Sequence, residues 1–393
     1  MRMLTSRPFR RARSAAGTAI GTLALAGGLA VALSGTASAT VVHRPHAARG
    51  ADRVVFVQTD NLAGNQVVAY HRGPDGTLSL ARAYGTGGLG GQLAGSVVDH
   101  LASQGSLQYD PLHATVYAVN AGSNTVSVFE ARGDHLFLRQ VVGSGGTFPV
   151  SIAVHGNLVY VLNALAGGSV QGYRAAFGRL IPIPGSMRLL GLDPTATPQF
   201  TNTPGQVAFS PDGSQLIVTT KANGNDIDVF RVNASGRLQA SPVVNPEPGT
   251  VPFAITFDQD GHLVIANAGT NAVATFALHP DGTVTLLDSL GTGQAATCWV
   301  VRDGGLLFAS NAGSANVSGY VSSKTGALTL LGQTPTDPGT VDAAVAPGGR
   351  YLYVQAGGRG NVDEFRVSRA GSLTSLGSLT VPGAVGGEGI ATA

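Results

Sequence analysis

Short apolar runs alternate with turns rich in glycine, asparagine and aspartate along nearly the whole chain after residue 53. The clearest unit contains the runs Phe253–Phe257, Leu263–Ala266, Ala272–Ala277 and Val284–Leu290. They are separated by Asp260-Gly261, Gly269-Thr270 and Asp281-Gly282. Runs of this length that are rich in β-branched and aromatic residues predict strands, and Asp-Gly predicts tight hairpins because glycine tolerates a positive φ. The unit therefore predicts four antiparallel strands.

The same unit recurs along the chain. Three copies share an Asn-Ala-Gly turn, at Val116–Phe129, Leu263–Phe276 and Leu307–Tyr320, and looser copies lie at Val55–Tyr70, Leu158–Tyr173, Leu216–Phe230 and Leu352–Phe365. The residues that start these turns are Gln58, Asn120, Asn163, Thr220, Asn267, Asn311 and Gln355, spaced by 62, 43, 57, 47, 44 and 44 residues. Such a period predicts an all-β, seven-bladed β-propeller.

The two ends of the repeat region predict how the ring closes. The first copy begins at Val54 with what should be a second strand, and no inner strand precedes it. Residues 387–393 resemble the starts of the inner strands at Gly205–Phe209 and Pro252–Thr256. We therefore expect the C-terminal strand to complete the first blade, which leaves no open sheet edge.

The N-terminus has the three parts of a secretory signal peptide. An arginine-rich start precedes an uncharged stretch over residues 14–39, which ends in Ala37-Ser38-Ala39. We predict a signal peptide over residues 1–39 with cleavage after Ala39, a polar lead-in over residues 40–53, and one propeller domain over residues 54–393 of a secreted protein. An uncleaved anchor helix and twin-arginine export through Arg10-Arg11 are the alternatives. No second membrane-spanning run follows.

Composition and charge narrow the function classes. The 56 glycines are about twice the usual share, and the predicted turns account for them. Five of the 24 Lys and Arg residues lie before residue 40 with no acidic residue, so the remaining chain has 19 basic and 22 acidic residues. That balance disfavours a nucleic-acid partner. The single cysteine, Cys298, excludes an internal disulfide or a multi-cysteine metal site, and Asp258-x-Asp260 lacks the other ligands of a calcium loop. We expect a monomer without metal or cofactor.

The repeat resembles the Tyr-Val-Thr-Asn type of propeller repeat, and the chain is similar to the seven-bladed lactonase family, with its 6-phosphogluconolactonases and carboxymuconate cyclases. The resemblance rests on Val116–Phe129, Gly205–Gly213, Pro252–Asn267, Phe308–Gly313 and Tyr351–Val354. It implies a lactonase-type hydrolase that works at the channel mouth. Because a phosphorylated sugar lactone is a cytosolic metabolite, a secreted enzyme would not meet 6-phosphogluconolactone. Asp99-His100 is the only counterpart found for the histidine-rich motif of the enzymatic members.

The candidate chemistry lies on one face of the predicted ring, where the turns between second and third strands meet the links between blades. Lactone hydrolysis needs a base for water and a donor or cation near the carbonyl oxygen. The candidate catalytic residues are His100, Glu388 and Asp342, with His100 pairing with one of the two carboxylates across the channel. The candidate substrate-binding residues are Asp99, Gln104, Gln206, Lys221 and Trp299.

Each of these residues also has a purely structural interpretation. His100 could be solvated, Glu388 could only cap the closing strand, Lys221 could be a surface charge, and Cys298 and Trp299 could line the core or the channel. Two functions remain: an exported lactonase-like hydrolase, or a non-catalytic propeller that binds a small molecule, glycan or protein on the channel face. A compact cavity with converging ionisable groups favours the first, and a broad neutral surface favours the second.

Overall fold

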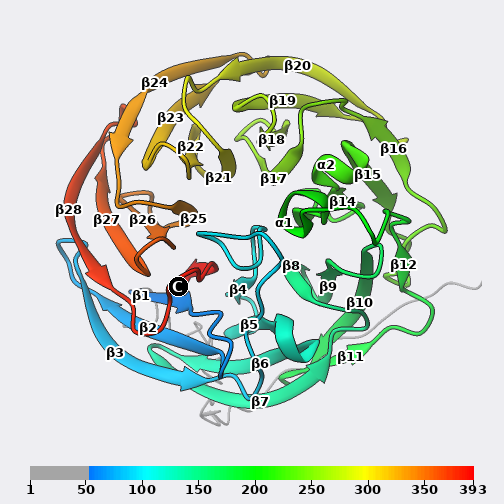
Figure 1. The fold of residues 1–393 in the computed structure, drawn as a ribbon, viewed down its shortest axis with the longest axis horizontal. Helices are drawn as coiled ribbons and strands as arrows, with labels where there is room; N and C mark the ends of the chain where they lie inside the picture. The colour runs from blue at the N-terminus through cyan, green and yellow to red at the C-terminus, as the bar shows by residue number, and fades with distance from the viewer. Residues whose placement is uncertain (1–52) are drawn as a thin grey trace, which may run out of the picture. The chain divides into compact units, whose positions relative to one another are not determined.

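The strands are arranged as seven antiparallel sheets around a ring, which confirms the predicted seven-bladed β-propeller (Figure 1). The structure is a computed structural model that describes residues 53–393. The predicted signal peptide and the lead-in before Arg53 lie outside the described residues. In each blade the innermost strand lines the centre of the ring and the fourth strand lies at the rim.

The blades follow one another along the chain. The first contains β29 (Ile390–Thr392), β1 (Val54–Gln58), β2 (Gln66–Arg72) and β3 (Leu78–Gly85), and the second contains β4 (Leu107–Asp110), β5 (Thr115–Asn120), β6 (Thr125–Arg132) and β7 (His135–Gly143). The third contains β8 (Pro149–His155), β9 (Leu158–Asn163), β10 (Ser169–Ala176) and β11 (Arg179–Pro182). A short additional strand, β12 (Arg188–Leu189), also pairs with β10, so this blade exceeds the predicted four strands.

The remaining four blades are regular. They contain β13 (Gln206–Phe209), β14 (Gln215–Thr219), β15 (Asp226–Arg231) and β16 (Val243–Pro246), then β17 (Pro252–Phe257), β18 (Leu263–Asn267), β19 (Ala272–Leu278) and β20 (Val284–Gly291). The sixth contains β21 (Thr297–Asp303), β22 (Leu306–Asn311), β23 (Asn316–Ser322) and β24 (Leu328–Pro335). The seventh contains β25 (Thr340–Val345), β26 (Tyr351–Ala356), β27 (Asn361–Val367) and β28 (Leu373–Thr380).

The ring closes as the sequence predicts. β29 pairs antiparallel with β1, with Val57 opposite Ile390 and Val55 opposite Thr392. The Ala393 backbone N–H extends this ladder by donating to the Val54 carbonyl at 2.9 Å. The last strand of the chain therefore supplies the inner strand of the first blade, and neither end leaves an unpaired inner edge.

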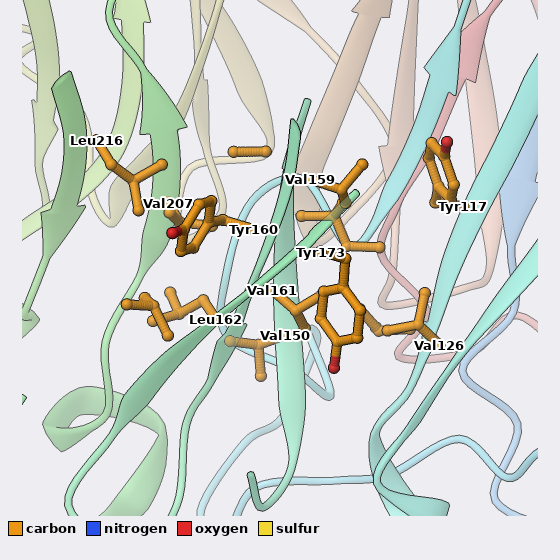
Figure 2. Close-up of a cluster of buried hydrophobic side chains, with 14 of the residues drawn as sticks. Tyr117, Val126, Val150, Val159, Tyr160, Val161, Leu162, Tyr173, Val207 and Leu216 are labelled. Atoms are coloured by element: carbon orange, nitrogen blue, oxygen red, sulfur yellow. The ribbon is translucent and has the colours of Figure 1, made fainter. Parts of the chain in front are cut away.

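Packing between neighbouring blades explains why the middle strands read as continuous apolar runs. All six residues of β5 are buried, and the corresponding strand of the third blade, β9, is buried except for its first residue. Figure 2 shows the largest of these interfaces, where Tyr117, Val161, Tyr173 and Leu216 come from successive blades. Two tyrosine hydroxyls of this interface still find acceptors, because Tyr173 donates to the Gly143 carbonyl at 2.6 Å and Tyr160 donates to the Gly236 carbonyl at 2.8 Å.

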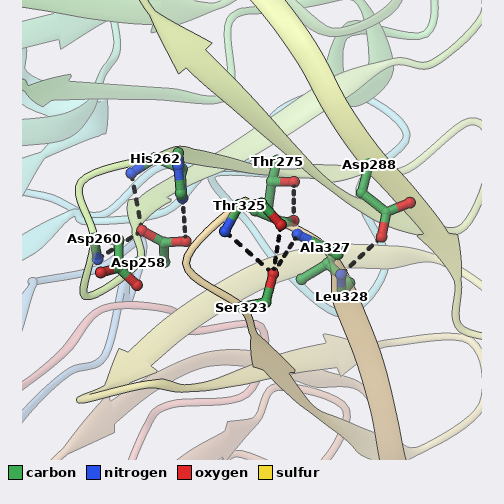
Figure 3. A network of polar contacts seen from close by, with 10 residues as sticks. Asp258, Asp260, His262, Thr275, Asp288, Ser323, Thr325, Ala327 and Leu328 are labelled. Atoms are coloured by element: carbon green, nitrogen blue, oxygen red, sulfur yellow. Dashed lines mark hydrogen bonds and ion pairs between the residues drawn. The ribbon is translucent and has the colours of Figure 1, made fainter.

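The Asp-Gly turns lie on the opposite face from the predicted site, and their side chains bond their own turns. Gly261 and Gly282 both adopt positive φ, as hairpin turns of this kind require. In the turn after β17, the Asp258 carboxylate accepts from the backbone N–H groups of Asp260 and His262 and contacts His262 Nδ1 at 2.8 Å (Figure 3). The Asp258 carboxylate, which the sequence analysis considered as a calcium ligand, is therefore bonded within its own turn.

Helix is almost absent from the described part of the chain. α1 (Gln199–Asn202) and α2 (Lys221–Gly224) have four residues each, and η1 (Ala121–Ser123) is a single 3-10 turn. No helix within residues 53–393 has the length and apolar character needed to cross a bilayer. The two α-helices lie beside the centre of the ring, where they help to form the site described next.

Candidate functional site

The link between β3 and β4 crosses the centre of the ring (Figure 1, light-blue segment in the middle). Its last residues bond to inner strands on several sides: the Gln104 N–H donates to the Gly205 carbonyl, and the Ile152 N–H donates to the Gly105 carbonyl. On another side the His100 N–H donates to the Gly386 carbonyl at 2.7 Å. We call residues 97–106 of this link the plug.

Gln104 and Ser103 anchor the plug to the sixth blade. The Gln104 amide donates to the Val300 carbonyl and accepts from the Val300 N–H, both at 3.0 Å, so it imitates the edge of a neighbouring strand. The Ser103 carbonyl accepts from the indole Nε1 of Trp299 at 2.5 Å. Gln206 has a similar role between blades, because its side-chain oxygen accepts from the Ile255 N–H. Gln104, Gln206 and Trp299 thus hold the scaffold of the site in place.

Four carboxyl groups gather in and around the plug: Asp60, Asp99, Asp342 and Glu388, all nearly inaccessible to solvent. Burial is the main cause that raises the pKa of Asp60, Asp99 and Asp342 to about 7 each. Burial, with the negative charge of neighbouring Asp99 and Asp60, also raises the pKa of Glu388 well above its ordinary value. Burial and mutual repulsion therefore disfavour simultaneous ionisation of all four groups at neutral pH.

Glu388 is the most enclosed of the four. The Ser103 N–H donates to its carboxyl at 3.2 Å, and the Ser103 hydroxyl contacts both this carboxyl and the Val150 carbonyl. A hydroxyl carries one proton, so it can donate to only one of these oxygens. Both contacts are satisfied when Ser103 donates to Val150 and a protonated Glu388 donates to Ser103, which agrees with the raised pKa.

Lys221 is buried rather than a surface charge, with 1% of its surface exposed. Its ammonium group donates to the carbonyls of Ala102 at 2.7 Å and Phe200 at 2.6 Å and lies 5.1 Å from the centre of the Phe253 ring. Burial lowers the pKa of Lys221 to about 8, although the charges of Asp99 and Glu388 oppose that change. An ammonium has three donors, so one is left for Asp99 or a ligand.

Asp99 and Lys221 meet in a pocket of about 160 Å³ at the mouth of the channel. They are the only charged groups among its described lining residues, and no ion pair within 4.0 Å joins them there. The other lining residues are Val97, Val98, Phe200, Thr201, Val251, Phe253, Ala268, Ala296, Cys298, Trp299 and Ala312. The site is therefore a compact, mainly apolar pocket in which a carboxyl and an ammonium group converge.

The two longest links of the chain build this pocket together. The first connects β3 to β4 and contains the plug, and the second connects β12 to β13 and contains α1. They contact each other where the Ala94 N–H donates to Gln199 Oε1 at 3.0 Å and the Phe200 N–H donates to the Ala94 carbonyl. The irregular repeat spacings of 62 and 57 residues mark both insertions. Those spacings were the signal that could have located the pocket from the sequence.

A second cavity of about 230 Å³ lies between the inner strands β4, β21, β25 and β29. Asp342 and Gln104 line it. The Asp342 carboxylate accepts from the Ala343 N–H at 2.8 Å, and bonds from the Gly105 and Ile390 backbones partly offset the effect of burial on its pKa. Asp342 and Asp99 thus face different cavities.

His100 is half-buried at the edge of the plug. Burial lowers the pKa of its imidazole, and a hydrogen bond with the backbone of Asp60 opposes that change. Its Nδ1 atom is buried and has no hydrogen-bond partner among the described residues. The structure places the ring beside Gly386 and Asp60, whereas the Glu388 carboxyl is directed to Ser103.

The cysteine lies in the wall of the mouth pocket, and the turn asparagines bond within their own blades. Cys298 lines the mouth pocket, and burial raises the pKa of its thiol, which keeps it protonated. Asn120 donates to the hydroxyls of Thr125 and Ser127, and Asn311 makes the equivalent contact with Ser318. No group of three or more His, Cys, Asp or Glu side chains within residues 53–393 is arranged to hold a metal ion.

Comparison with known proteins agrees with the fold. Residues 175–301 match the family model described as Lactonase, 7-bladed beta-propeller. A candidate 6-phosphogluconolactonase from Bacteroides uniformis is 18% identical with a TM-score of 0.70, and the match covers 87% of this chain and 100% of that one. Periplasmic gluconolactonase PpgL from Pseudomonas aeruginosa is 19% identical with a TM-score of 0.66, covering 87% of this chain and 99% of that one. No curated protein sequence matches significantly.

The fold and the site define a seven-bladed propeller with a plugged channel and a small pocket at its mouth. The family match and the structural neighbours confirm the predicted resemblance to the seven-bladed lactonase family. At identities below 20%, the similarity to these solved structures supports the fold of this chain and says nothing about its reaction. The Tyr-Val-Thr-Asn type of the repeat stays a prediction.

Proposed function

We propose that this protein is a lactonase-like hydrolase that acts in the mouth pocket, between Asp99 and Lys221. One observation carries the proposal: an apolar pocket holds a carboxyl group with a pKa of about 7 and an ammonium group with a pKa of about 8. Titratable groups perturbed in this way and converging in a cavity are typical of active sites. A carboxylate with a pKa near 7 suits general-base catalysis at neutral pH.

The two groups supply what lactone hydrolysis requires. Asp99 takes a proton from a water molecule, whose oxygen forms a bond to the lactone carbonyl carbon. The free N–H of Lys221 donates to the carbonyl oxygen, which carries the negative charge of the tetrahedral intermediate. As the intermediate collapses, the ring C–O bond breaks, and the leaving oxygen receives the proton held by Asp99. The product is the open hydroxy acid, and both side chains return to their starting state.

The three predicted catalytic residues take different places in this proposal. Glu388 is a positioning residue, since its carboxyl group holds Ser103 in the plug. His100 packs at the plug edge, and Asp342 faces the second cavity. Their direct participation in catalysis, and secretion of the protein as a monomer, stay predictions.

Ligand binding without catalysis is the second candidate function. Two of the three Lys221 N–H donors already bond to the backbone carbonyls of Ala102 and Phe200. This favours binding without catalysis, because a group that stabilises the carbonyl oxygen of a substrate would ideally direct all its donors to that oxygen. A small molecule could fill the same pocket without reacting.

The test is hydrolysis of a panel of simple lactones by the purified protein and by Asp99→Asn and Lys221→Met variants. We expect Asp99→Asn to lower kcat/KM by about 100-fold or more, as removal of a general base does. Asp193→Asn and Lys324→Met, both at exposed positions, are the matched controls and should leave the rate unchanged. Hydrolysis that survives Asp99→Asn but is lost in His100→Ala and Glu388→Ala would move the reaction to the originally predicted residues. No hydrolysis by the unaltered protein would favour the binding function.

A further inference from the structure

We infer that the mouth pocket selects small, uncharged lactones with hydrocarbon substituents and rejects polyhydroxylated and anionic sugar lactones. This inference rests on the proposed function and specifies its substrate class. It separates this chain from the gluconolactonases whose fold it shares.

The walls of the pocket are apolar and favour binding of hydrocarbon groups of a ligand. Val98, Phe200, Val251, Phe253 and Trp299 present aliphatic and aromatic surface from four different segments. The Phe253 and Trp299 rings pack together with centroids 5.0 Å apart, and the only Trp299 donor is used by the Ser103 carbonyl. These rings therefore offer surface to a ligand without an available hydrogen bond.

The polar capacity of the pocket is too small for a sugar ring. Apart from Asp99 and Lys221, Thr201 is the one described lining residue with a hydroxyl group. Each ligand hydroxyl enclosed without a partner weakens binding by about 10-fold or more. A lactone with several ring hydroxyls would leave most of them unpaired, whereas an alkyl lactone has only the ester group, which lies between Asp99 and Lys221.

The charges also disfavour an anionic substrate. Lys221 is the only cation among the described lining residues, and two of its three donors are already bonded to Ala102 and Phe200. Its charge is balanced by Asp99, and Glu388 lies close enough to affect its pKa. A phosphate or carboxylate on the substrate would meet the Asp99 carboxylate without an arginine to bind it.

The size of the pocket sets the size of the reacting part. Its volume of about 160 Å³ is close to that of an engineered protein cavity that binds benzene, at about 150 Å³. A five- or six-membered lactone ring with a short alkyl group fits such a space. A longer alkyl substituent on the lactone would extend out of the pocket along Val97, which is 82% exposed at the rim.

Two measurements test the inference. Hydrolysis of δ-hexalactone, glucono-δ-lactone and 6-phosphogluconolactone is compared, and binding of unreactive δ-valerolactam is followed through tryptophan fluorescence. Trp299 is the only tryptophan of the chain and lines the pocket, so its emission reports occupancy independently of catalysis. We expect kcat/KM for δ-hexalactone to exceed that for both sugar lactones by about 100-fold or more, and a saturable change of fluorescence with the lactam.

A variant that fills the pocket locates the effect. Ala268→Leu adds volume at a partly exposed wall position and should abolish both lactam binding and δ-hexalactone hydrolysis. Ala370→Leu, on an exposed turn after β27, is the matched control and should change neither.

The outcomes separate the substrate class from the function. Equal or faster hydrolysis of a sugar lactone, sensitive to Asp99→Asn, would overturn the substrate class and leave the hydrolase in place. No hydrolysis of any lactone, with lactam binding that Ala268→Leu abolishes, would overturn the hydrolase and keep the ligand class. Neither hydrolysis nor a change of Trp299 fluorescence would overturn both.

Discussion

Removing the closing strand should strongly destabilise the propeller, although the strand is only three residues long. Deletion of residues 390–393 removes β29 and exposes the inner edge of β1. It also uncovers Phe56, which is fully buried and packs in the same cluster as Ala391 and Ala393. The perturbation therefore acts on the junction between the first and last blades rather than on a free tail.

The structure allows the cost to be estimated. Burial of Ile390, 5% exposed, contributes about 2 kcal/mol, and burial of the two alanine methyl groups about 1 to 2 kcal/mol. The backbone bonds of the β1–β29 ladder and the Thr392 hydroxyl bond to the Val345 carbonyl at 2.7 Å add about 1 kcal/mol each. The sum is about 5 to 8 kcal/mol, a large part of the roughly 5–15 kcal/mol that stabilises a typical protein.

Thermal and urea unfolding of the full chain and the deletion variant, followed by circular dichroism, measure this loss. We expect Tm to fall by about 10 °C or more, since about 1 kcal/mol shifts Tm of a large domain by about 2–4 °C. Deletion of Ala393 alone removes one ladder bond and is the graded control, with an expected fall of a few degrees. A Tm within about 2 °C of the full chain after deletion of residues 390–393 would refute the closure as a source of stability.

The remaining predictions concern the plug and the buried carboxyl groups. Asp60, Asp99 and Asp342 have pKa values of about 7 in the folded protein and an ordinary value of 3.8 in an unfolded chain, so the folded state binds more protons between about pH 4 and 7. The stability of the fold should therefore decrease as the pH rises through that window. A Tm at pH 8 equal to the Tm at pH 5 would contradict this prediction. Glu388→Gln can still donate to Ser103 and should cost little, whereas Glu388→Ala should cost about 2 kcal/mol or more; equal losses of Tm would show that Glu388 is not protonated. In Gly357→Ala the new Cβ would lie 1.9 Å from the Val98 carbonyl oxygen, so the plug must shift and Trp299 fluorescence should change, whereas Gly291→Ala meets no atom within 4 Å and should not alter it.

Local sequence information was sufficient for the fold. The four predicted strands around Leu263–Ala266 agree with β17 to β20 to within one residue at each end, and the Asp-Gly turns fall where predicted. Ring closure was also predictable, because a missing inner strand at Val54 matched a surplus strand at the C-terminus. These features depend on period, turn chemistry and the rule that sheet edges are paired, all of which are local or repeat along the chain.

The sequence predicted Asp99, Lys221 and Trp299 on one face of the ring, and the structure brings all three to one pocket. It did not show that Asp342 would line a separate cavity, or that Asp60 would join the buried carboxyl groups. Gln104 and Gln206 both bond to neighbouring inner strands, and their predicted contact with a substrate stays a prediction. A side chain's role here depends on which strand lies opposite, and the repeat pattern alone does not specify that partner.

The sequence by itself determined a closed ring of seven four-stranded blades and the face on which reactive side chains gather. Only the tertiary structure decided that the plug crosses the channel and that Asp99 and Lys221 are buried together. The reason is that burial and pKa depend on segments far apart along the chain. Lys221 bonds to a carbonyl 119 residues away, at Ala102, in a link whose path no local pattern encodes. The chemistry of the pocket follows from that distant contact.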